Sequence, residues 1–300
     1  GRNLMRTYLN RVHQPASCRW LRLFYSMTRF PAGACDLIVS AGGKTSFANA
    51  WLARRVGVPN VYAGSLRRLS PQLFTVVLTL EPVRGASGNL VLDLPPSAID
   101  FGALQIEGER FLEQFGLAGQ PCWTLLIGGN GAGYQYRRQD WQALARLMNA
   151  LASRYDIRWL LVSSRRSGKR AEHLLWDNID AGIVAAHSWY EEGGGFRVDA
   201  WLGAGQRIFV TEDSMTMLTE AIYSHRPVVS LRPQRAVPSD RYQRMMQRFA
   251  DSGYVCRYAL AELSQQPGML EGRQCGVLEV SPLDELAAEL CKRLGMAQTH

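Results

Sequence analysis

The stretch from Ile208 to Pro233, IFVTEDSMTMLTEAIYSHRPVVSLRP, constrains the fold more than any other part of the chain. Its apolar runs predict buried strands at Ile208–Thr211 and Val228–Leu231, and apolar residues at helical spacing predict a helix between them. The helix ends before Pro227, because the residue preceding a proline is disfavoured in the helical region. Two buried strands joined by a helix form a parallel unit, so the predicted fold class is α/β.

Polar residues follow the first of these strands, where parallel sheets bind their ligands. Ser214 and Thr216 lie at the predicted helix entrance beside Asp213, and Glu220 comes at least one turn later. Free amides at a helix N-terminus attract phosphate by about 0.3–1 kcal/mol, and a carboxylate such as Glu220 can accept two ribose hydroxyls. Taken alone, the stretch favours an ordinary helix that Asp213 or Ser214 caps, with Glu220 in solvent.

The same strand–turn–helix pattern occurs twice more. A strand at Asp36–Ser40 leads through Gly42, Gly43 and Lys44 to a helix at Ser46–Val56. Glycines there let a ligand approach the backbone, although a tight turn explains them equally well.

The second instance is richer in glycine. A strand at Cys122–Ile127 leads through Gly128, Gly129 and Asn130 to a helix at Arg138–Arg154. A glycine-rich turn between strand and helix is the usual cradle for an anion. The turn fits neither the GxGxxG nor the Walker pattern, so it predicts neither an NAD site nor a P-loop.

Two arginines follow the next strand, Trp159–Val162. Arg165 and Arg166 could clamp a pyrophosphate, since each charged hydrogen bond contributes about 1.5–3 kcal/mol, or they could form a basic surface turn. A further strand, Gly182–Ala186, leaves His187 at its end.

These alternations predict two doubly wound, Rossmann-like α/β domains that face a cleft. A linker at 116–121 separates domain 1–118 from domain 119–300, and we expect the first domain to begin upstream of Gly1.

The net charge is +8, and residues 1–70 hold eleven Lys or Arg against one acid, Asp36. A basic first domain predicts an anionic partner, but no motif supports nucleic acid. Cys18–Phe30 has the pattern of a basic amphipathic helix, which could lie on an acidic membrane or equally pack on the core.

No run of 18 apolar residues predicts a membrane-spanning helix. The six cysteines are scattered without a CxxC, so we expect no zinc site, and we expect Cys35 and Cys122 to be reduced core residues. A reducing cytoplasm is the predicted location, at the inner face of the membrane if the basic helix binds there.

Four motifs in this order resemble a bacterial family named after a plant mitochondrial-fission protein and assigned to the GT-B glycosyltransferases: DLIVSAGGKTSFANAWLARRVGVP, LLIGGNGAGYQY, LLVSSRRSG and VTEDSMTMLTEAIYSHRPV. The resemblance covers roughly residues 36–231. The chain is more distantly similar to the GT-B enzyme that adds N-acetylglucosamine to the lipid-linked peptidoglycan precursor.

The resemblance implies a nucleotide-sugar donor bound by the second domain and an acceptor over the first. Donor residues matching the families' motifs are Gly128, Gly129, Asn130, Arg165, Ser214, Thr216, Glu220 and Gln243. Gly42, Gly43 and Lys44 would lie on the acceptor side.

The resemblance leaves the catalytic base open, because the loop that often carries it would precede Gly1. His187 and Glu212 are candidates within the chain, and neither matches a family base. No DxD motif is present, which fits a transfer without metal or other cofactor, in which arginines and helix amides stabilise the leaving diphosphate.

The leading hypothesis is a glycosyltransferase that builds a cell-envelope glycan such as lipopolysaccharide. A nucleotide-sugar 2-epimerase and a non-catalytic adaptor with the same fold are the alternatives. The epimerase is disfavoured because it needs several acids and histidines in the cleft. The chain has only five histidines, and we expect few of them to face the cleft.

Overall fold

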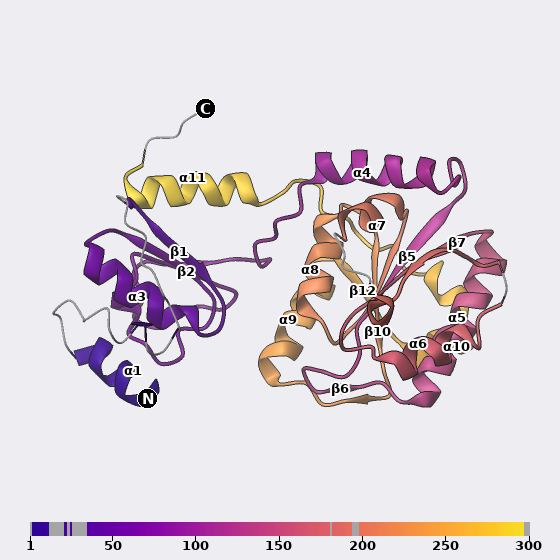
Figure 1. The fold of residues 1–300 in the computed structure, drawn as a ribbon, viewed down its shortest axis with the longest axis horizontal. Helices are drawn as coiled ribbons and strands as arrows, with labels where there is room; N and C mark the ends of the chain where they lie inside the picture. The colour runs from indigo at the N-terminus through magenta and orange to yellow at the C-terminus, as the bar shows by residue number, and fades with distance from the viewer. Residues whose placement is uncertain are drawn as a thin grey trace. The chain divides into compact units, whose positions relative to one another are not determined.

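A computed structural model describes residues 2–11, 21, 22, 25, 35–180, 182–193 and 198–296 (Figure 1). The chain divides into two compact units. The first unit comprises Gly1–Pro96 and Pro282–His300, and the second comprises Ser97–Ser281. Most of the predicted helix at Cys18–Phe30 lies outside the described residues.

The second unit is built on a sheet of six parallel strands in the order β12-β10-β9-β5-β7-β8. The strands are β5 (Cys122–Ile127), β7 (Arg158–Ser163), β8 (Val184–Ser188), β9 (Ile208–Thr211), β10 (Val228–Arg232) and β12 (Val255–Ala259). Numbered along the unit and read from β8, this is the 3-2-1-4-5-6 order of a doubly wound sheet. The order reverses between β5 and β9, which makes this pair the switch point.

Helices cover both faces of this sheet, so its central strands are buried on both sides and read as apolar runs. One face carries α5 (Arg138–Tyr155), α6 (Lys169–Trp176) and α10 (Leu260–Gln265), and Figure 1 shows α8 (Met215–Tyr223) and α9 (Asp240–Asp251) on the opposite side. Trp159 and Phe209 anchor the core beneath α5.

A pair of helices and a small ribbon complete the second unit. Helix α4 (Phe101–Gln114) packs against α7 (Asp199–Ala204), where Gly108 and Gly203 let the two backbones meet. Strands β6 (Tyr134–Gln135) and β11 (Arg235–Ala236) form an antiparallel ribbon. Single turns of 3₁₀ helix occur at Pro71–Leu73 in the first unit and at Tyr190–Glu192 and Pro267–Leu270 in the second.

The first unit has a four-stranded parallel sheet in the order β1-β2-β3-β4. Its elements are α1 (Arg2–Arg11), β1 (Ile38–Ala41), α3 (Thr45–Val56), β2 (Asn60–Ala63), β3 (Val76–Thr79), β4 (Asn89–Val91) and α11 (Leu283–Leu294). Phe47 and Trp51 of α3 pack with Tyr62 in one cluster. Leu286 and Leu290 of α11 pack with Val76 in another.

These units differ from the predicted domains in two places. Residues 97–118 lie with the second unit because Leu104, Gly108 and Phe111 of α4 are buried there. The rings of Phe111 and Trp201 are 4.7 Å apart in a tilted arrangement. The C-terminal helix belongs to the first unit, because its leucines complete the apolar cluster there.

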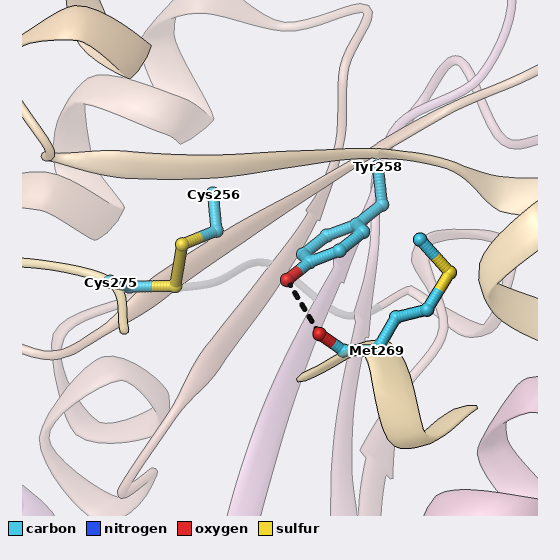
Figure 2. The surroundings of a disulfide bond; sticks show 4 residues. All are labelled: Cys256, Tyr258, Met269 and Cys275. Atoms are coloured by element: carbon cyan, nitrogen blue, oxygen red, sulfur yellow. Dashed lines mark hydrogen bonds between the residues drawn. A yellow bond between two sulfur atoms is a disulfide. The ribbon is translucent and has the colours of Figure 1, made fainter. Parts of the chain in front are cut away.

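A disulfide joins Cys256 of β12 to Cys275, and beside it the Tyr258 hydroxyl donates to the Met269 carbonyl at 3.3 Å (Figure 2). Cys35 and Cys122 are free, as predicted, although Cys35 is only half-buried. The cysteine pattern did not predict the pair, and disulfides are typical of oxidising compartments. The cysteines therefore no longer support a reducing location.

Candidate functional site

Three turns meet at the carboxyl edge of the second sheet, at its switch point. Residues 128–131 follow β5, residues 164–167 follow β7, and residues 212–214 lead from β9 into α8. Ligands of doubly wound sheets bind at this position, outside the carboxyl ends of the strands where their order reverses. The fold therefore selects these three turns as the candidate site.

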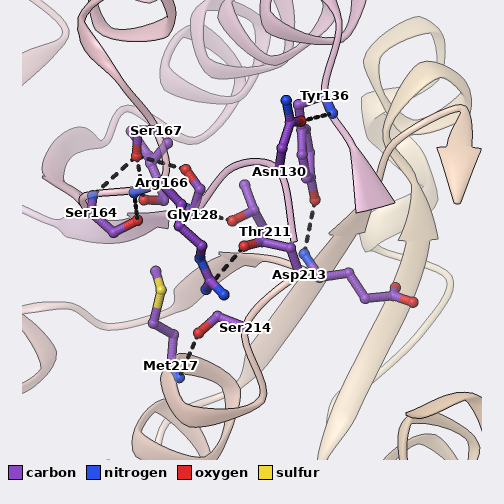
Figure 3. A network of polar contacts seen from close by, with 12 residues as sticks. Gly128, Asn130, Tyr136, Ser164, Arg166, Ser167, Thr211, Asp213, Ser214 and Met217 are labelled. Atoms are coloured by element: carbon purple, nitrogen blue, oxygen red, sulfur yellow. Dashed lines mark hydrogen bonds and ion pairs between the residues drawn. The ribbon is translucent and has the colours of Figure 1, made fainter. Parts of the chain in front are cut away.

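Hydrogen bonds fasten the three turns to one another (Figure 3). The Gly128 amide donates to the Thr211 hydroxyl at 2.6 Å. The Ser167 hydroxyl lies 2.8 Å from the Ile127 carbonyl and 2.6 Å from the Gly128 carbonyl, and it accepts from the Ser164 amide at 3.0 Å. These hydrogen bonds hold the three turns in fixed positions relative to one another.

An ion pair between Arg166 and Asp213 lies at the centre of these turns (Figure 3). One guanidinium nitrogen of Arg166 is 3.0 Å from Oδ2 of Asp213, whose side chain is 0 % exposed while that of Arg166 is 38 % exposed. Among the described residues, neither Asp213 oxygen accepts a hydrogen bond of good geometry. Arg166 is therefore the main counter-charge of a buried carboxylate, and it still has donors that reach solvent.

Burial raises the pKa of Asp213 above its ordinary value, because desolvation disfavours the charged form. The Thr211 hydroxyl and the positive charge of Arg166 oppose that rise. Removing Arg166 would therefore leave an acid that is costly to ionise.

The first two glycines of the turn after β5 are required by protein contacts. A Cβ on Gly128 would lie 2.2 Å from an oxygen of Asp213, and one on Gly129 would lie 1.9 Å from the Arg166 carbonyl. In the structure these glycines admit the neighbouring turns, and their predicted contact with a ligand stays a prediction. Asn130 is exposed at the rim, and its side chain accepts from the Tyr136 amide at 2.8 Å.

Helix α8 begins beside this ion pair. Its N-cap is Ser214, one of the two caps that the sequence allowed, the other being Asp213. The Ser214 hydroxyl accepts from the Met217 amide at 3.5 Å. Thr216 is exposed in the first turn. Glu220 is half-buried, and its pKa is raised by burial and then by the negative charge of Asp199 at the start of α7.

Glu212, a candidate base from the sequence, makes contacts that link several strands of the second unit. Its buried carboxylate pairs with Arg257 at 2.5 Å and accepts from the Tyr134 hydroxyl at 2.9 Å and the Ser230 hydroxyl at 3.3 Å. These partners join β9, β6, β10 and β12. The engaged carboxylate argues against a role as a base.

The remaining predicted donor residues lie outside the ion-pair cluster. Arg165 is exposed beside Arg166. Gln243 in α9 is exposed and donates to the Pro238 carbonyl at 3.0 Å, near Ser239, which caps this helix. His187 lies on β8, the edge strand, which β7 separates from β5.

In the first unit, the predicted acceptor residues form the turn from β1 into α3. Gly42 and Gly43 have φ of 69° and 43°, a region that favours glycine, and the Gly42 amide donates to the Ala63 carbonyl at 2.8 Å. Lys44 is exposed next to the helix start. The turn is as predicted, and its ligand stays a prediction.

Over the described part of the chain, no group of three or more His, Cys, Asp or Glu side chains is arranged to hold a metal ion. None of the described helices is both long and apolar enough to cross a bilayer.

Several solved structures are similar to this chain in structure and share little sequence with it. A co-structure of S. aureus MnaA with UDP is 9% identical, covers 99% of this chain and 82% of its own, and has a TM-score of 0.57. The complex of Methanocaldococcus jannaschii UDP-GlcNAc 2-epimerase with UDP-GlcNAc and UDP is 11% identical, covers 86% of this chain and 76% of its own, and has a TM-score of 0.54. The E. coli ADP-heptose LPS heptosyltransferase II is 16% identical, covers 86% of this chain and 76% of its own, and has a TM-score of 0.48.

The two parallel sheets and the first two of these alignments define a GT-B-like α/β protein with two Rossmann-like units. No curated protein sequence matches the chain. Residues 3–294 match the family described as mitochondrial fission ELM1, and the chain belongs to that family.

Sequence reasoning and the topology of the sheet select the same turns as the candidate site, but the sequence did not predict the Arg166–Asp213 pair. Two signals were available: an acid directly after a buried strand, and two adjacent arginines after the neighbouring strand. The pattern could not tell which arginine turns inward.

Proposed function

We propose that this protein is a glycosyltransferase that moves a sugar from a nucleoside diphosphate sugar to an acceptor. The observation that carries the proposal is the partly exposed Arg166 side chain, paired with a buried carboxylate at the switch point beside the start of α8. Nucleotide complexes of the two similar structures, with UDP and with UDP-GlcNAc, support a donor of this class.

In the proposed donor site, Arg166 and the first amides of α8 hold the diphosphate. Arginine is suited to this role because its planar donors match phosphate oxygens in pairs. As the sugar leaves, these groups stabilise the negative charge on the departing diphosphate. Ser214 and Thr216 lie beside the phosphates, and Glu220 accepts hydroxyls of the ribose.

Asp213 is a positioning residue in this proposal. The pair with Asp213 limits the rotamers of Arg166 before a ligand arrives, and preorganised donors lose less entropy on binding. Gly128 and Gly129 keep Asp213 and the turn of Arg166 in close contact with the end of β5.

The acceptor is proposed to be a cell-envelope glycan or a lipid-linked sugar, at the inner face of a membrane. Support comes from the basic first unit, with Lys44, Arg67 and Arg68 exposed near the carboxyl ends of its strands. An acidic surface would attract this edge.

A thermal-shift screen with UDP-, GDP-, dTDP-, ADP- and CMP-sugars tests the donor class. A ligand at 100 times its dissociation constant stabilises the folded state by about 2.7 kcal/mol, which is a measurable shift. We expect one nucleotide series to stabilise the protein saturably, and no stabilisation by any of them contradicts the proposal.

Calorimetry with the best ligand then tests the site. Arg166→Ala alone would leave Asp213 buried without a counter-charge, so Arg166 is replaced in an Asp213→Asn background. We expect this double variant to bind at least tenfold more weakly, because one charged hydrogen bond contributes about 1.5–3 kcal/mol. Arg165→Ala is the matched control and should change the affinity less than threefold. Equal losses in both variants would remove the assignment to Arg166.

Glu220→Ala tests the ribose contact in the same assay. We expect at least tenfold weaker binding of the nucleotide and no change for inorganic pyrophosphate, which has no ribose. Unchanged nucleotide affinity would remove Glu220 from the donor site.

A nucleotide-sugar 2-epimerase is a second candidate, because one structure of higher TM-score is an enzyme of that kind. Product analysis separates the two reactions, since epimerisation converts the donor without an acceptor. A non-catalytic adaptor would instead capture partners equally well with and without nucleotide.

A further inference from the structure

A second cavity lies in the same unit, apart from the three turns of the candidate site. It encloses about 590 Å³ between one face of α6 and the segment that runs from the end of β8 into the turn at Tyr190–Glu192. None of its lining residues belongs to the turns after β5 or β9. The cavity flanks β8, the edge strand, rather than the switch point.

Three aromatic rings form one side of this cavity. The ring of Trp176 lies 4.8 Å from that of His187 and 6.2 Å, edge-on, from that of Trp189. His187 and Trp189 are 5.6 Å apart. Trp176 is 50 % exposed although it is a large apolar residue, so its ring is accessible to a ligand.

Carboxylates dominate the rest of the lining. Four acids, Glu172, Asp177, Glu191 and Glu192, line it together with Lys169 and His173. Glu172 is buried and accepts from the Ser163 hydroxyl at 2.5 Å, and Glu192 lies 3.7 Å from a ring nitrogen of His187. The chain has a net charge of +8, so this local excess of negative charge is opposite in sign to the charge of the whole chain.

We propose that this cavity, which the glycosyltransferase proposal does not use, binds an organic cation of the ammonium or guanidinium class. The face of a tryptophan ring attracts such cations through the ring quadrupole, which places partial negative charge on the face. The surrounding carboxylates add a Coulombic attraction. A phosphate or carboxylate ligand would be repelled by the same four acids. The cation could be a free amine or the Lys or Arg side chain of a partner protein.

Two matched ligand pairs test the charge requirement by calorimetry on the full chain. Choline is compared with 3,3-dimethylbutan-1-ol, its neutral counterpart, and N-acetylarginine amide with neutral N-acetylcitrulline amide. We expect saturable binding of a cation, at least tenfold tighter than that of its neutral partner. Preference for choline indicates a free amine, and preference for the arginine derivative indicates a protein side chain.

Variants then test the location. Trp176→Ala and Asp177→Asn change exposed positions, and each should weaken cation binding at least fivefold. Phe115→Ala is the control, because Phe115 is an aromatic side chain of matched exposure, 48 %, elsewhere in the unit. It should leave the affinity unchanged.

Three results would overturn the proposal: no saturable binding of either cation, equal binding of the neutral partners, or equal loss in Trp176→Ala and Phe115→Ala. The variants touch no residue of the donor site, so nucleotide affinity should be unaltered in all of them. Failure here is thereby distinguishable from failure of the proposed glycosyltransferase activity.

Discussion

At the scale of single residues, Asp213 connects the fold to the proposed function. A carboxylate with no exposed surface lowers stability when it is ionised, yet it fixes the side chain of Arg166 where an anion would bind. Such an arrangement is expected at a functional site, where stability is exchanged for a preorganised charge. Replacing the acid should therefore improve folding and impair binding.

The pH dependence of stability tests the first half of that expectation. Since burial raises the pKa of Asp213, the folded state holds a proton at pH values where the unfolded chain has lost it. The free energy of unfolding contributed by this group therefore falls as pH rises above the ordinary value of 3.8 and levels off above the folded pKa.

Urea unfolding of the wild type and Asp213→Asn between pH 4 and pH 8 measures this effect. The stability of the wild type relative to the variant should decrease with rising pH. A relative stability that increases with pH would mean that Arg166 outweighs burial, and the electrostatic account of the site would be wrong.

Sequence reasoning at this scale succeeded where the chemistry is local. A helix cap depends on the residues of one turn, so the sequence pattern limited the cap of α8 to Asp213 or Ser214, and the structure shows Ser214. The choice between Arg165 and Arg166 depends on a partner 47 positions away on another strand. The engagement of Glu212 by Arg257 has the same long-range origin.

At the scale of elements, the contact between α4 and α7 brings two helix backbones close together. A Cβ on Gly108 would lie 2.3 Å from the Gly203 carbonyl carbon and 2.6 Å from the Ala204 amide nitrogen, which are backbone atoms that cannot rotate away. This approach attaches α4 to the unit.

Gly108→Ala should destabilise the protein by about 1–3 kcal/mol, because the added methyl forces the two helices apart. Gly102→Ala is the matched control in the same helix, where a Cβ would meet only Asp100 Oδ1 at 3.4 Å. Alanine has the higher helix propensity, so the control should stabilise by up to about 1 kcal/mol. Thermal unfolding of both variants gives the comparison, and equal effects would contradict the packing.

The disulfide gives a second prediction at this scale. Cys256 and Cys275 are 19 positions apart and enclose α10, so their link reduces the entropy of the unfolded chain by the equivalent of about 3 kcal/mol. Cys256→Ala/Cys275→Ala should lose about that much in urea unfolding under oxidising conditions. Cys291→Ala, which removes a free thiol, should lose far less.

The strands were predicted well because buried parallel strands are short apolar runs between turns. β5 and β9 begin and end where the sequence placed them. The ribbon of β6 and β11 was not predicted, since two residues per strand carry no periodic signal and their pairing is long-range.

At the scale of the whole molecule, the chain does not divide at the glycine-rich segment that resembles a linker. Composition marked 116–121 as a boundary, but a linker is defined by the contacts that do not cross it. The apolar side chains of α4 are buried in the second unit, and those of α11 in the first.

Fragments test this division. Residues 97–281 should fold alone and unfold cooperatively, whereas residues 119–281 should be less stable by about 3–6 kcal/mol. That difference corresponds to the burial of Leu104 and Phe111, at about 1.5–3 kcal/mol each. Equal stability of the two fragments would return the boundary to the predicted position.

The central claim is that the turns around Arg166 and Asp213 bind a nucleoside diphosphate, and amide shift mapping by NMR tests it most directly. Titration of the nucleotide selected by the thermal-shift screen should move the amide signals of residues 128–131, 164–167 and 214–217 together, with one saturation curve. Saturable shifts confined to other parts of the chain, with these three turns unperturbed, would contradict the account.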